Sequence, residues 1–163
     1  VVIDVGPNQP LSETGRAYFG DYLEGSVTAS DFGDYTASGK VSETLNSTLS
    51  QQLIKLNKIR RAVPALQKGQ YTSVGDMCFK RGYTNPETGE KSFACVAVTN
   101  AAEFSDIPNG KYIDAVTGDV KNVTDGTLTI AASGKGNCRV YVLSSNGYTG
   151  ISGKIGDTTT YLK

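Results

Sequence analysis

The chain contains no histidine and no tryptophan, and only three cysteines and one methionine among its 163 residues. Without histidine it cannot form a Ser-His-Asp triad, a Cys-His nucleophile pair or a zinc site with imidazole ligands. Any catalysis would therefore have to use carboxylates, lysine or tyrosine. The 16 basic and 16 acidic residues cancel, so no net charge attracts nucleic acid or an anionic membrane surface. No apolar run reaches the roughly 20 residues that a membrane-spanning helix needs.

Glycine, serine, threonine and tyrosine are abundant instead, with 19 glycines and nine tyrosines. This composition is typical of extracellular β-proteins and predicts a secreted or cell-surface protein, which we expect to be bacterial. The apolar start at Val1 is too short to be a signal peptide, so a secretion signal would lie outside this sequence. At this length the chain has room for one domain with an appendage.

A helix is predicted over residues 45–63. Apolar side chains recur there at three- and four-residue spacing, at Leu49, Leu53, Leu56 and Ile59. Asn46 or Ser47 is a suitable N-cap, and lysines and arginines crowd the last turns, where cations suit the helix dipole. Pro64 ends the helix because the residue before a proline is driven out of the helical conformation. Residues 45–69 therefore form a helix and its connector.

Residues 70–143 alternate between short strand patterns and turn signals, which predicts an antiparallel Greek-key β-sandwich and a mainly β fold class. The strands are expected over residues 76–83, 91–99, 111–116, 127–132 and 137–143. Residues 1–44 show weak periodicity and read as an irregular segment. Residues 144–163 have the composition of a linker, or end in an edge strand.

The cysteines leave two interpretations open. Cys78 and Cys95 flank a predicted hairpin whose turn runs from Asn85 to Gly89. Pairing Tyr83 with Glu90 would place the two cysteines opposite each other, close enough for a cross-strand disulfide. The alternative is that Cys78, Cys95 and Cys138 are all reduced and buried as small apolar residues.

The connector and the strands together resemble glycoside hydrolase family 13, the α-amylases. The segment from Leu53 to Gly69, with its core Lys58-Ile-Arg-Arg-Ala-Val-Pro-Ala-Leu-Gln-Lys-Gly69, looks like the last helix of the family's catalytic barrel, which leads into a C-terminal β-sandwich called domain C. The order and spacing of several later pieces also fit that domain: Met77-Cys-Phe-Lys-Arg81, Ala94-Cys-Val-Ala-Val-Thr-Asn100, Gly110-Lys-Tyr-Ile-Asp-Ala-Val-Thr-Gly118, Asp125-Gly-Thr-Leu-Thr-Ile130 and Arg139-Val-Tyr-Val-Leu143. The resemblance covers residues 49–143.

The resemblance implies that this chain is a structural C-terminal region and not itself the catalyst. The family needs an aspartate nucleophile, a glutamate acid and a second aspartate beside a histidine, and none of these motifs is present. A complete barrel takes about 200 residues or more, so it cannot precede residue 45 in this chain. Ala17-Tyr-Phe-Gly-Asp21 is similar to the stretch after the last barrel strand, so residues 1–44 are expected to be a barrel remnant.

No catalytic residue, metal ligand or cofactor is predicted for this chain, although Ca²⁺ would be held by the parent enzyme. The expected partner is the catalytic barrel, facing Leu49, Leu53, Leu56 and Ile59. A homodimer through the N-terminal segment or the helix is a further expectation, because an apolar helix stripe needs cover.

An independent module that binds starch or another α-glucan, or an adhesin-like module, is the alternative. Tyr83, Tyr148 and Tyr161 are its candidate sugar-binding residues because they fall in predicted loops or at chain ends. Tyr112 and Tyr141 fall within predicted strands and are expected in the core.

Overall fold

The computed structural model describes residues 46–155, and residues 1–45 and 156–163 lie outside the described part. The chain divides into two compact units, Val1–Ile54 and Lys55–Lys163. The predictions for residues 1–44, for Tyr161 and for a terminal edge strand therefore fall on residues that are not described. Of the first unit, the described residues are the start of one helix.

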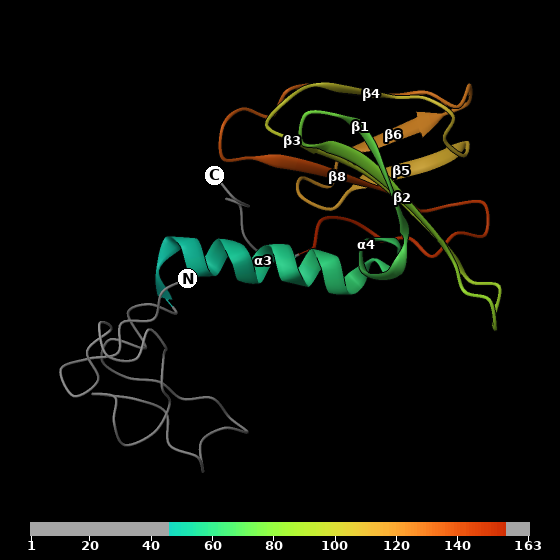
Figure 1. Ribbon diagram of the computed structural model, residues 1–163, viewed down its shortest axis with the longest axis horizontal. Helices are drawn as coiled ribbons and strands as arrows, with labels where there is room; N and C mark the ends of the chain where they lie inside the picture. Colours follow the sequence, from blue (N-terminus) through green and yellow to red (C-terminus); the bar gives the residue numbers. More distant parts are fainter. Residues whose placement is uncertain (1–45, 156–163) are drawn as a thin grey trace, which may run out of the picture. The chain divides into compact units, whose positions relative to one another are not determined.

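That helix, α3, spans Thr48–Ala62 (Figure 1). Ser47 caps it: its hydroxyl accepts a hydrogen bond from the amide of Ser50 at 3.3 Å, which satisfies one of the free N–H groups of the first turn. The helix ends one residue before Val63, which is extended at φ −119° and ψ 104° because Pro64 follows it. Pro64 then occupies the first position of a second, short helix, α4 (Pro64–Lys68). This helix was not predicted from the sequence.

Eight strands follow and form two antiparallel sheets. The strands are β1 (Gln70–Gly75), β2 (Cys78–Thr84), β3 (Lys91–Val98), β4 (Ala102–Phe104), β5 (Gly110–Asp114), β6 (Val120–Val123), β7 (Leu128–Ile130) and β8 (Cys138–Leu143). Sheet A has the order β1-β2-β3-β8-β5-β6, and the small sheet B pairs β4 with β7. The predicted mainly β, antiparallel sandwich after a helix is confirmed.

Sheet A has two covered faces, and its strands alternate between them. One face packs against sheet B through a core that contains Phe104, Tyr112 and Ile130, and we call it the closed face. The other packs against Ile59 and Val63, against α4, and against residues beyond β8, and we call it the helix face. In Figure 1, α4 and β4 lie on opposite sides of the large sheet. Strand β8 lies at the centre and contributes Val142 to the helix face and Leu143 to the closed face, which explains its nearly continuous apolar sequence.

The β2–β3 hairpin corrects the predicted register by two residues. Tyr83 pairs with Ser92, and Cys78 lies opposite Ala97. The turn is tighter than expected because the amide of Asn85 donates to the carbonyl of Glu90 at 2.8 Å. The predicted Cys78–Cys95 disulfide is therefore not formed, and Cys78, Cys95 and Cys138 are all free and buried. The alternative of three reduced, buried cysteines is the one observed.

Residues 144–155 are not the free linker that their composition suggested. Ile151 and Ile155 pack against the core of the helix face. The amide of Thr149 donates to the carbonyl of Lys91 at 2.7 Å, and the amide of Ile155 donates to that of Ala115 at 2.8 Å. This segment therefore closes part of the helix face without forming a named strand.

Candidate functional site

The junction between α4 and sheet A is held at both ends of the short helix. At its start, the amide of Ala65 donates to the hydroxyl of Ser92, which is buried in β3, at 3.1 Å. At its end, the guanidinium of Arg81 donates to the carbonyls of Leu66 at 2.7 Å and Gly69 at 2.7 and 3.0 Å. A cation bonded to the last carbonyls of a helix satisfies free acceptors and suits the dipole. Hydrogen bonds at both ends thus hold α4 against sheet A.

Gly69 permits this close joint. A Cβ atom at this position would lie 2.5 Å from the carbonyl oxygen of Ala65 and 2.8 Å from that of Gly82. Both obstacles are backbone, so a larger residue would push α4 away from β2. A glycine directly after a predicted helix was visible in the sequence, but the requirement for close approach is visible only in the structure.

Beside this joint, the helix face is hollowed by a groove of about 270 Å³. We call it the apolar groove. Its lining includes the apolar side chains of Leu56, Phe79, Val98 and Cys138 and the two arginines Arg60 and Arg81. All of these residues belong to the second unit. The side chain of Leu56 is 37% exposed, although a leucine normally lies inside a domain.

The helix stripe expected to face a barrel is divided in the structure. Ile59 is only 2% exposed and packs in the chain's own core, although it also borders the apolar groove. Leu49, Leu53 and Leu56 remain exposed, as does Ile54. The helical spacing of the four predicted residues was the same, and only packing against sheet A separates Ile59 from the others.

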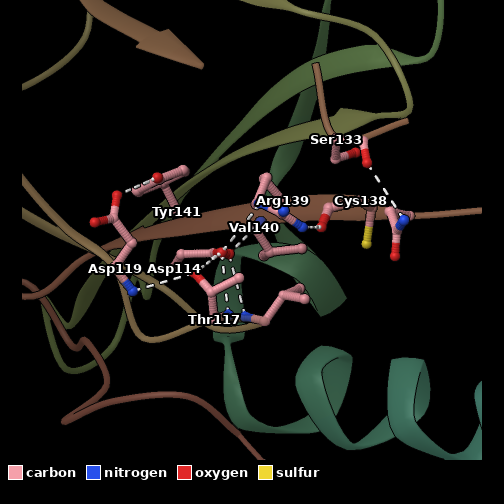
Figure 2. A network of polar contacts seen from close by, with 10 residues as sticks. Asp114, Thr117, Asp119, Ser133, Cys138, Arg139, Val140 and Tyr141 are labelled. Atoms are coloured by element: carbon pink, nitrogen blue, oxygen red, sulfur yellow. Dashed lines mark hydrogen bonds and ion pairs between the residues drawn. The ribbon is translucent and has the colours of Figure 1, made fainter. Parts of the chain in front are cut away.

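A buried carboxylate lies at the end of β5 and contacts β8 beside Val140, one of the residues that line the groove (Figure 2). Asp114 is 0% exposed. Its Oδ1 accepts hydrogen bonds from the amides of Val116 at 3.1 Å and Val140 at 2.8 Å, and its Oδ2 accepts from the amide of Thr117 at 3.1 Å and the Thr117 hydroxyl at 2.6 Å. The Nε of Arg139 lies 3.8 Å from Oδ2. These donors offset the cost of burying the charge.

The geometry gives Asp114 a structural role. The last residue pair between β5 and β8 is Asp114 with Tyr141. The Asp114 carboxylate then accepts a hydrogen bond from the next amide of β8, that of Val140, and so extends the contact between the two strands. Tyr141 donates its hydroxyl to Oδ2 of Asp119 at 2.6 Å, and burial together with this contact raises the pKa of Tyr141 far above its usual range. The signal in the sequence was Asp114, Thr117, Gly118 and Asp119, residue types that favour a turn with side-chain to backbone bonds.

The predicted sugar-binding tyrosines do not form one surface. Tyr83 packs against the core of the helix face, with the ammonium of Lys68 5.8 Å from its ring centroid. Tyr148 packs against the core of the closed face, so the two rings lie on opposite sides of sheet A. Tyr161 lies outside the described residues. Tyr112 and Tyr141 are buried in the core, as predicted.

Tyr71, which was not predicted as a candidate, is exposed and pairs with the half-buried ring of Phe79. Tyr71 on β1 is 54% exposed and stacks on Phe79, with ring centroids 5.1 Å apart and planes inclined by 34°. Tyr71 was overlooked because β1 was not predicted, so nothing indicated that it and Phe79 lie on neighbouring strands. Only the register, with Tyr71 opposite Arg81, brings them together.

Two of the buried thiols, Cys95 and Cys138, have raised pKa values. Burial raises the pKa of Cys95 to about 12, with Lys80 opposing the shift. Burial also raises the pKa of Cys138 to about 11. The charge of Asp114 contributes to this increase, and the charge of Arg139 opposes it. The thiolate is the reactive form of cysteine, so neither is a nucleophile at neutral pH.

Within residues 46–155, no group of three or more cysteine, aspartate and glutamate side chains is arranged to hold a metal ion. Neither α3 nor α4 has the length and hydropathy to cross a bilayer. No protein-family model matches the chain, and no curated protein sequence matches it.

Proposed function

We propose that this chain is the C-terminal structural region of a secreted α-amylase of glycoside hydrolase family 13, which packs against the catalytic barrel and is not itself catalytic. The observation that carries the proposal is the joint at α4. A helix with apolar side chains left exposed ends at Pro64, and Arg81 and Ser92 then fix the following turn on an antiparallel sandwich. A joint bonded in this way holds the end of α3 close to the sandwich, as the junction between a barrel and a C-terminal domain requires.

The chemistry of the described residues agrees with a supporting role. The one buried carboxylate among them, Asp114, uses both oxygens on backbone and hydroxyl donors, and the retaining or inverting mechanisms require two facing carboxylates with free oxygens. In the parent enzyme, the catalytic groups and a Ca²⁺ site would belong to the barrel.

The decisive experiment is to read the gene upstream of Val1 and to assay both proteins on starch. We expect a reading frame that encodes a (β/α)8 barrel before this chain, and we expect the longer protein to hydrolyse starch. The 163-residue chain should release no reducing sugar. Hydrolysis by the short chain, or a reading frame without a barrel, would contradict the proposal.

A second candidate function is α-glucan binding, which one observation favours: the exposed Tyr71 stacked on Phe79. Exposed aromatic rings offer a face to the C–H groups of a sugar ring. Gel retardation in starch and calorimetry with maltoheptaose test this function, with Tyr71→Ala as the variant and Tyr83→Ala as the matched control. Equal migration of all three proteins with and without starch would rule this function out.

A further inference from the structure

The apolar groove carries an inference about what covers the helix face. We propose that it docks an acidic protein surface, in which apolar side chains enter the groove and a carboxylate pairs with Arg60. We assign this surface to the catalytic domain of the same polypeptide, so the inference rests on the proposed function and specifies the contact that the domain makes.

The size and lining of the groove favour side chains as occupants. A closed apolar cavity of about 150 Å³ holds one benzene molecule, so the groove, at about 270 Å³, has room for one or two large apolar side chains. Pockets for small molecules are usually larger, at about 300–1,000 Å³, and carry several convergent polar groups. Here Leu56, Phe79 and Val98 offer apolar surface. Of the two arginines that line the groove, Arg81 is bonded to carbonyls, whereas the guanidinium of Arg60 has no partner among the described residues.

The charge distribution specifies the partner as acidic. Residues 45–75 contain five lysines and arginines and no aspartate or glutamate, whereas residues 76–155 contain eight of each sign. Within residues 46–155, the guanidinium of Arg60 makes no hydrogen bond and no ion pair, while Arg81 beside it is fully engaged by carbonyls. An arginine at the edge of an apolar contact is typical of protein interfaces, and complementary charge fixes their register.

The same features argue against a nucleic acid or a membrane. Phosphate groups are bound by several converging cations, and the groove itself offers the single free guanidinium of Arg60. The apolar groove, with the guanidinium of Arg60 at its edge, is complementary to a protein surface that carries an apolar side chain next to a carboxylate.

Photo-crosslinking in the natural polypeptide that contains this chain tests the contact. A benzophenone amino acid is placed at Leu56, in the groove, and in a control protein at Thr129, which is exposed on β7 of sheet B. We expect the Leu56 probe to capture a peptide of the preceding domain that contains an aspartate or glutamate, and the Thr129 probe to capture none. Capture of residues 1–45, of a second copy, or of nothing would overturn the inference.

Charge substitution gives a second readout on the same polypeptide. We expect Arg60→Glu to speed hydrogen–deuterium exchange of α4 and β2 at least about tenfold, because close charge pairs in interfaces are strongly coupled. Arg60→Lys should retain most of the protection, and Arg61→Glu, outside the groove, should behave like the parent protein. Equal exchange in all of these proteins would also overturn the inference.

The two proposals fail separately. If the Leu56 probe captures a preceding domain that does not hydrolyse starch, the proposed function is wrong and the acidic docking surface stands. If the preceding domain hydrolyses starch but no capture occurs, the function stands and the docking inference is wrong.

Discussion

The two faces of sheet A are covered in different ways. The closed face is completed by the chain itself, because sheet B places Phe104, Leu128 and Ile130 over Tyr112. The helix face has its own core around Ile59 and Val63, but a groove lined by apolar side chains stays open beside it. Apolar surface left open beside a packed core is typical of an interface. The chain therefore completes the closed face alone, and our proposal places a neighbour over the groove of the helix face.

The largest expected effect tests whether the closed face carries the stability. Phe104 is fully buried, and we expect Phe104→Ala to lower the free energy of unfolding by about 3–5 kcal/mol. Phe79 lines the open groove, so Phe79→Ala should cost about 1 kcal/mol in the same chain. Urea denaturation measures both. Equal losses would show that the helix face is as fully packed as the closed face.

The second prediction concerns the turn that joins β5 to β8. Removing the carboxylate in Asp114→Ala leaves the buried amides of Val116 and Val140 without an acceptor, so we expect a loss of about 2–4 kcal/mol. Asp125→Ala is the matched control, because Asp125 also accepts a turn amide, from Thr127, but at an exposed position. It should cost less than about 1 kcal/mol in the same denaturation experiment. A control as costly as Asp114→Ala would mean that burial is not the cause.

The third prediction tests the joint on the helix face. Arg81→Met keeps most of the side-chain stem but loses the bonds to Leu66 and Gly69, and we expect a loss of about 1–3 kcal/mol with faster amide exchange in α4. Lys80→Met, one residue earlier, removes an exposed bond to the carbonyl of Ser105 and should cost about 0.5 kcal/mol. Unchanged exchange in Arg81→Met would show that α4 is held without the guanidinium.

The smallest effect compares a thiol on each face. Cys138 lines the groove, whereas Cys95 lies in the core of the closed face. With a thiol reagent at pH 8, we expect Cys138 to react faster than Cys95, and both far slower than in the unfolded chain. Mass spectrometry of the labelled peptides distinguishes them, and faster labelling of Cys95 would reverse the assignment of the open face.

These thiols also make stability depend on pH in a defined direction. In the unfolded chain Cys138 ionises near pH 9, whereas burial keeps it protonated in the folded chain up to about pH 11. The unfolded state then binds fewer protons, so stability falls as pH rises from about 9 to about 11. Cys138→Ser should reduce this slope, as urea denaturation at several pH values would show.

Local rules predicted much of the fold. Ser47 caps α3, Pro64 ends it, and strands β2, β3, β5, β7 and β8 appear near their expected places, since each of these depends on neighbouring residues. The strands missed were β1, β4 and β6. β4 and β6 are only three and four residues long, and the mostly exposed β1 lacks an alternating pattern. The register of the β2–β3 hairpin was wrong because it depends on how tightly the turn after Asn85 closes.

The candidate site could be predicted only in outline. Helical spacing placed four apolar residues on one stripe: Leu49, Leu53, Leu56 and Ile59. Their burial depends on which other residues pack against the stripe, and the spacing carries no information on those residues. The same holds for Tyr83 and Tyr148. Both were predicted in loops and were therefore grouped together, but they pack on opposite faces of sheet A.

The sequence by itself determined the composition, the absence of histidine chemistry, the helix with its proline end, and the antiparallel sandwich, because each follows from the properties of single residues or short spacings. Only the tertiary structure decided which apolar residues are core and which are exposed, which carbonyls Arg81 holds, and that Asp114 supports a strand. These outcomes depend on residues far apart in the chain, brought together by sheet register and packing.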